Sequence, residues 1–172
     1  MKIISAVAIL AFALSVNAQQ DKPAEKPPEK QDQHHEGVNE RGDHVMGFSH
    51  EKTTHHFRVY NDGGAIEVTA NDAKDTASRD QIRMHLGHIA GMFAAGDFEA
   101  PFLIHGVNPP GTATMKDLRE QIEYKFANTD RGGRVRITAH NAEALKAVHE
   151  FLRFQIKDHQ TGDSAEVSKD LK

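Results

Sequence analysis

SRDQIRMHLGHIAGMF, residues Ser78–Phe93, predicts the helix on which the rest of the chain is built. At about 100° per residue its apolar side chains share one narrow face; they are Ile82, Leu86, Ile89 and Phe93. Beside this apolar stripe runs a row of side chains that can bind metals, namely His85, His88 and Met92. The stretch therefore predicts a helix that packs on a sheet or on another helix, with metal-capable side chains along the edge of its buried face.

A β-hairpin is predicted immediately before this helix. HHFRVY (His55–Tyr60) and AIEVTA (Ala65–Ala70) alternate in the manner of half-buried strands. Asn61–Gly64 between them consists of residues that tolerate positive φ, which favours a tight turn. Asp75 or Thr76 can then cap the first turn of the helix.

A second hairpin and helix are predicted in the last third of the chain. Ile122–Phe126 and Arg134–Ala139 alternate around the turn Asn128–Gly133. Asn141 caps a helix that extends to about Lys157. The buried stripe predicted for this helix is Leu145, Val148, Leu152 and Ile156.

The two halves of the chain resemble each other. GGAIEVTA (63–70) parallels GGRVRITA (132–139), and a helix follows each. A further strand is predicted at Pro101–Val107, with His105 on one of its faces. We therefore expect an α+β fold of two layers, in which two ββα units form an antiparallel sheet of about five strands with two main helices on one face.

The ends of the chain predict export and a single folded domain. Met1–Ala18 has the basic start, short apolar run and small-residue cleavage site of a signal peptide, which implies a periplasmic or secreted protein. Residues 19–43 are rich in Pro, Glu, Lys and Gln and predict a disordered linker. The α+β domain is expected at 44–159 and a flexible tail at 160–172. No later segment approaches the roughly 20 apolar residues of a transmembrane anchor.

The composition restricts the chemistry. The chain has 12 His, no Cys and a formal net charge of −4 with His neutral. A negative net charge disfavours nucleic acid as a partner, because nucleic-acid binding requires a basic surface. Without Cys, a bound metal must be held by His, Met, Asp or Glu. The high His content therefore points to a transition-metal site.

The leading functional hypothesis is binding, buffering or delivery of copper or zinc. Inward strand positions and helix stripes meet in a two-layer fold, so imidazoles placed on them can converge. The predicted ligands are His55, His85, His105 and His149, assisted by His88 or Met92. A thioether ligand from Met92 or Met46 would suit copper(I). A more local alternative is a loop site formed by His44, Met46, His50, His55 and His56.

Two other classes of function remain open. One is a binding module of the cell envelope with structural histidines, which recognises an anionic small molecule, an envelope protein or a second copy of the chain. The other is a small hydrolase or lyase with His as the base. Ser78, Asp80 and His85 lie on or near one helix, whereas a catalytic triad needs members from separate elements. The pattern thus favours binding over catalysis.

Three segments carry a resemblance to known sequences: Met46–Phe57, Asp75–Phe93 and His149–Asp163. Over roughly Gly42–Asp163 the chain resembles a group of small exported bacterial proteins without assigned function, some of which carry the label aspartate carbamoyltransferase. The resemblance implies export and a single small domain. Ser78-Arg79-Asp80 does not reproduce the Ser-x-Arg-Thr phosphate loop of that enzyme, so no catalytic residue is carried over.

Overall fold

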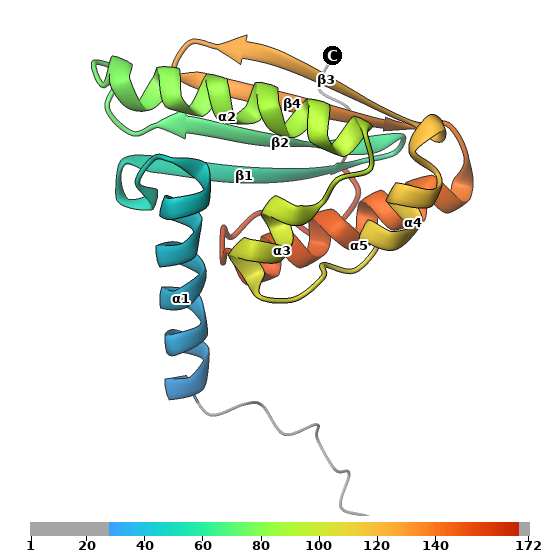
Figure 1. Ribbon diagram of the computed structural model, residues 1–172, viewed down its shortest axis with the longest axis horizontal. Coiled ribbons are helices and arrows are strands. Elements are labelled where there is room, and N and C mark those ends of the chain that lie inside the picture. The colour runs from blue at the N-terminus through green and yellow to red at the C-terminus, as the bar shows by residue number, and fades with distance from the viewer. Residues whose placement is uncertain (1–27, 169–172) are drawn as a thin grey trace, which may run out of the picture.

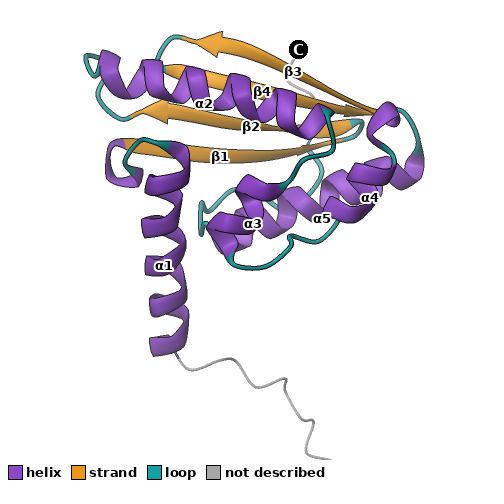
Figure 2. Cartoon of the chain, viewed as in Figure 1, coloured by secondary structure: helices purple, strands orange, loops and turns teal. Residues whose placement is uncertain are grey.

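The structure is a computed structural model that describes residues 28–168, and the predicted signal peptide lies outside these residues. The described chain is an α+β fold with a four-stranded antiparallel sheet in the order β1-β2-β4-β3 (Figures 1 and 2). No described helix is both long and apolar enough to span a membrane. The elements are α1 (Pro28–Met46), the 3-10 turn η1 (His50–Lys52), β1 (Thr53–Tyr60), β2 (Gly63–Ala70), α2 (Thr76–Ala94), α3 (Glu99–His105), α4 (Thr112–Asp117), η2 (Arg119–Gln121), β3 (Ile122–Thr129), β4 (Gly132–Ala139) and α5 (Ala142–Asp158).

Helices α2 and α5 cover the same face of the sheet. Gly64 of β2 lies against Leu152 of α5, and Gly133 of β4 lies against Leu86 of α2. Gly64 pairs with Ile137, which alternates with Gly133 along β4, so both glycines belong to one face. Each hairpin is followed by one of these helices, β1-β2 by α2 and β3-β4 by α5. A common origin of the two halves stays a prediction.

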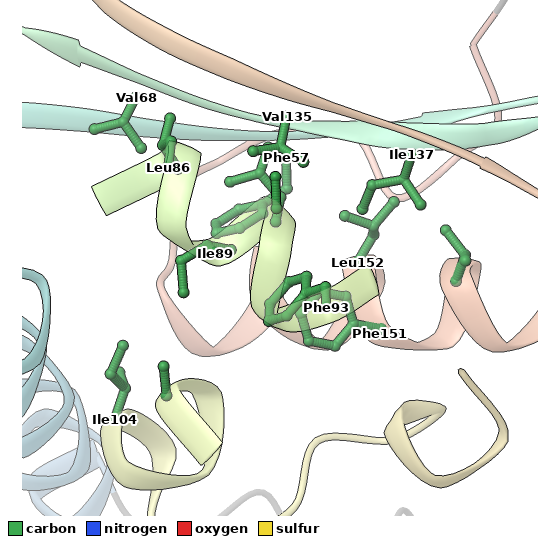
Figure 3. Packing of buried hydrophobic residues seen from close by; sticks show 14 of the residues in the cluster. Phe57, Val68, Leu86, Ile89, Phe93, Ile104, Val135, Ile137, Phe151 and Leu152 are labelled. Carbon is green, nitrogen blue, oxygen red and sulfur yellow. The ribbon is translucent and has the colours of Figure 1, made fainter. Parts of the chain in front are cut away.

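The core lies between this sheet face and the two helices (Figure 3). All four residues of the predicted α2 stripe are buried, which confirms the helical period of the opening stretch. In α5 the buried face also takes in Ala144, Ala147 and Phe151, while Leu145 is only partly buried. The α5 stripe is therefore rotated slightly from the predicted one, because Phe151 packs edge-on against Phe93.

The fifth strand predicted at Pro101–Val107 is wrong, since this segment belongs to helix α3. Pro101 sits in the first turn of α3, where proline is tolerated because the backbone N–H groups there have no helical partner. Gly106 ends the helix in the left-handed conformation at φ 70°. The short alternation of Leu103, His105 and Val107 thus arises within one helical turn and its C-cap.

From Pro28 onward the segment predicted as a disordered linker, 19–43, forms helix α1 in the structure. Val38 is fully buried, and Arg41 Nε donates a hydrogen bond to the carbonyl oxygen of Ile104 at 2.8 Å. Packing against α3 thus stabilises α1, whose composition alone would not make it a stable helix. In Figure 1 the far end of α1 extends away from the sheet, whereas its last turn approaches β1 and α3.

The described part of the predicted flexible tail lies along the edge strand β1. Asp163 accepts hydrogen bonds from the backbone N–H of Phe57 at 2.9 Å, from His56 Nδ1 at 3.0 Å and from Arg58 at 2.9 Å. Ser168 donates its N–H to the carbonyl of Val59 at 2.8 Å. Burial raises the pKa of Asp163, but these hydrogen bonds outweigh it and leave that pKa below its usual value. Asp163 therefore holds the tail as a charged acceptor.

Replacing Asp163 by Asn is expected to release this segment from β1. The variant loses the charge-assisted hydrogen bonds to Arg58 and His56, which should lower the free energy of unfolding by about 1–2 kcal/mol. Urea unfolding measures the loss, and limited proteolysis should cut the released tail faster. Glu166→Gln is the matched control, because Glu166 is an exposed carboxylate of the same segment. Equal stability of the two variants would contradict the assignment.

Candidate functional site

Two adjoining cavities lie beside the histidines of β1 and α5. The inner cavity, of about 50 Å³, is lined by α2, α3, α5, the end of α1 and the inward face of β1 and β2. The outer one, of about 230 Å³, lies between α1, β1 and the chain that leaves α5. Three residues line both cavities: Met46, His55 and His159. One thioether and two imidazoles therefore form the boundary between the inner and outer spaces.

His55 occupies this boundary because strand alternation turns it inward, as predicted. Its ring stacks between Phe48 and His159, with centroid distances of 5.9 Å and 5.7 Å. Burial, and after it the charge that His85 would carry, lower the pKa of His55 from 6.5 to about 4. The imidazole is therefore neutral at physiological pH and keeps a nitrogen lone pair.

His159 is the main site residue that the sequence prediction missed. It is the C-cap of α5, and its ring meets that of His105 edge-on at 4.9 Å. Burial lowers the pKa of His159 to about 3, with further lowering by His55 and His105. The signal was present in the sequence, because His159 follows Leu152 by seven residues, or two helical turns. The predicted stripe stopped at Ile156, one turn too early.

His85 lines the inner cavity from α2, at the edge of the buried stripe where it was predicted. Phe48 lies between His85 and His55, with its ring 5.6 Å from that of His85 in an edge-on arrangement. Burial, and secondarily His88, lower the pKa of His85 to about 4. His85 is thus a third neutral imidazole close to the same space.

His105 also lines the inner cavity, but from helix α3 and not from the predicted strand. Its Nδ1 donates to Asp158 at 2.5 Å, and its Nε2 lies 2.9 Å from the side-chain oxygen of Gln155. The other Asp158 oxygen accepts a hydrogen bond from His34 at 2.9 Å. Burial raises the pKa of Asp158, yet the hydrogen bonds from His34 and His105 prevail and lower it. A charged carboxylate therefore stands directly behind the cavity.

Hydrogen bonding distinguishes two sets among the histidines. His34, His50, His56 and His105 pair with aspartates, and His149 pairs with a backbone carbonyl. The imidazoles of His55, His85 and His159, by contrast, form no hydrogen bond with any residue in the described part of the chain. Imidazoles that line a cavity without a protein partner have ring nitrogens free to bind a ligand, so these three are candidates for a binding site.

Two other unpaired polar groups border the same cavities. Gln155 is 4% exposed and lines the inner cavity, and its Nε2 has no hydrogen-bond partner among the described residues. The buried Nδ1 of His35 is likewise unpaired and lines the outer cavity. An unsatisfied buried polar group costs on the order of 1–3 kcal/mol, which a suitable ligand would offset.

The remaining predicted ligands lie elsewhere. His149 donates from Nε2 to the carbonyl oxygen of Tyr60 at 2.8 Å, so it ties α5 to the end of β1. His88 and Met92 face a separate surface depression. In the alternative loop site, His50 pairs with Asp43, His56 pairs with Asp163, and His44 is exposed. Of that loop set Met46, His50 and His55 line the outer cavity, and Met46 and His55 also line the inner one.

Within residues 28–168 no group of three or more His, Asp or Glu side chains is arranged to hold a metal ion. Any site at the cavity boundary must therefore use the Met46 thioether or turn the rings of His55 and His159. Comparisons with protein-family models, with curated proteins and with solved structures found no match. The candidate site thus rests on its own geometry and chemistry.

Proposed function

We propose that the protein binds copper(I) at the boundary of the two cavities, through Met46, His55 and His159. The observation that carries the proposal is that these three side chains, and no other described residues, line both cavities. A ligand held by all three would lie between the apolar inner cavity and the more polar outer one. Such a position suits an ion that is bound and later released.

The donor set favours copper(I) over zinc. A thioether is a soft ligand that selects copper(I), while neutral imidazole suits both copper and zinc. Because the pKa values of His55 and His159 are lowered to about 4 and about 3, neither ring must lose a proton before it binds at neutral pH. The small volume of the inner cavity, about 50 Å³, also fits an ion better than an organic molecule.

The surroundings support a cation at this position. Asp158 lies behind His105, whose ring contacts that of His159 at 4.9 Å. Asp158 thus places a negative charge near the proposed site, which favours a bound cation. The role that follows is buffering or delivery of copper in the exported compartment that the sequence predicts. No redox step is required, because copper(I) keeps its oxidation state on binding.

Methyl NMR of the methionines tests the proposal directly. The purified protein, labelled with carbon-13 at the methionine methyl groups, is titrated with copper(I) without oxygen. The Met46 methyl signal is expected to shift and saturate, while that of Met115, fully buried in the core, stays unchanged. Competition with a copper(I) chelator then gives the affinity.

Variants sharpen this test. His159→Gln should weaken copper(I) binding at Met46 by at least about tenfold, equivalent to roughly 1.4 kcal/mol. His140→Gln is the matched control, because His140 is exposed and lines neither cavity. A Met46 signal that does not respond to copper(I), or an unchanged affinity in His159→Gln, would overturn the proposal.

A further inference from the structure

A third depression, of about 190 Å³, opens on the surface where α2 meets α3 and the end of α1. Three donors from one stripe of α2 line it: His85, His88 and Met92. Residues three, four and seven apart lie on the same side of a helix, so these side chains stand above one another. His88 is exposed and Met92 is partly buried. The depression thus presents two imidazoles and one thioether toward solvent.

This depression is distinct from the copper site proposed above. It shares neither Met46, His55 nor His159 with that site. His85 is the one histidine that lines both the surface depression and the inner cavity. The fold therefore distributes the ligands predicted for one metal site between the inner cavity and the surface depression. His85 lines both.

We infer that His85, His88 and Met92 form a second copper(I) site, which exchanges its ion with solvent. The His85 ring is neutral at physiological pH and has no hydrogen-bond partner in the described part of the chain, so its lone pair is available. The Met92 thioether supplies the soft ligand that selects copper(I) over zinc. Glu99 lines the same depression and adds a negative charge beside the bound cation.

The two sites differ in the solvent exposure of their ligands, and we expect this to set how fast copper(I) leaves each site. Met46, the thioether of the first site, is buried, whereas His88 of the second site is exposed on the surface of α2. A competing thiolate or thioether can approach the surface ion directly, by ligand exchange at constant oxidation state. Copper(I) at the surface site is therefore expected to leave faster than copper(I) at Met46.

The two sites have separate reporters in the methionine NMR experiment. With copper(I) added to the purified protein, the Met92 methyl signal is expected to shift in its own binding step. The methyl of Met84, which is 73% exposed on the same helix and lines none of the three cavities, is the internal control. Addition of glutathione should return the Met92 signal to its free position before that of Met46.

The variant His88→Gln is expected to weaken the Met92 response at least several-fold and to leave the Met46 response unchanged. His88 is exposed, so this variant should keep the fold. A Met92 signal that ignores copper(I), or one that responds equally in His88→Gln, would overturn the second site even if Met46 binds. A response at Met92 without one at Met46 would retain the second site and remove the proposed inner one.

Discussion

The protein is expected to lose stability steadily as the pH falls from about 6.5 to about 4, before most carboxylates are protonated. The cause is the three unpaired imidazoles. The pKa is lowered to about 4 for His55 and His85, and to about 3 for His159. In the unfolded chain each returns to its ordinary value near 6.5. At pH values between the lowered pKa of the folded state and the ordinary pKa, the unfolded state binds protons that the folded state does not.

The sign of the effect follows from proton binding. Stability rises with pH wherever the unfolded state holds more protons, so acid destabilises the fold within this window, while above about pH 6.5 the three groups have no effect. Each group contributes a slope of at most about 1.4 kcal/mol per pH unit. Over the whole pH window the contribution of each group is on the order of 3 kcal/mol. Three such groups approach the whole stability of an ordinary domain. A large loss of stability is therefore expected near pH 4.5.

Urea unfolding followed by circular dichroism between pH 4 and pH 8 measures this dependence. His159→Gln removes one of the three groups and should reduce the slope by about a third, whatever it does to stability at neutral pH. His140→Gln, at an exposed histidine, should leave the slope unchanged. A free energy of unfolding that stays constant from pH 7 to pH 4.5 would show that these imidazoles are not held neutral by burial.

The second large effect is expected for Gly64→Ala. A Cβ at Gly64 would overlap both the carbonyl oxygen of Arg58 and the Cδ1 atom of Leu152. One neighbour is backbone of the adjacent strand and the other belongs to a fully buried residue of α5, so neither moves away cheaply. The β1–β2 hairpin or α5 must shift, and the free energy of unfolding should fall by about 3 kcal/mol.

Gly91→Ala provides the matched control for this substitution. Gly91 lies on the exposed side of α2, and an added Cβ there meets no atom within 4 Å. Alanine is the better helix former, so this variant should gain about 0.5–1 kcal/mol. Thermal and urea unfolding of both variants test whether Gly64→Ala lowers the free energy of unfolding while Gly91→Ala raises it. Similar midpoints for Gly64→Ala and the unsubstituted protein would mean that α5 does not pack closely on β2.

Part of the candidate site was predictable from the sequence. Strand alternation placed His55 on the inward face, and the helical period placed His85 at the edge of the α2 stripe. The role of His149 was not predictable, because its partner is the carbonyl of Tyr60 on a distant strand. The sequence also could not show that His88 and Met92 lie outside the inner cavity, because the helical period does not identify the cavity that each turn of a helix faces.

Local sequence pattern was enough to predict the hairpins, the helices α2 and α5, and the buried apolar stripe of α2. These features depend on alternation, on the helical period and on turn residues, all of which act between near neighbours in the chain. Packing between distant parts of the chain, by contrast, makes 28–46 a helix, makes the segment at Pro101 helical and places the tail along β1. The same packing determines which histidines form hydrogen bonds. Contacts between residues far apart in the chain, such as the stacking of His55 on His159 and the hydrogen bond of His56 with Asp163, cannot be read from local pattern.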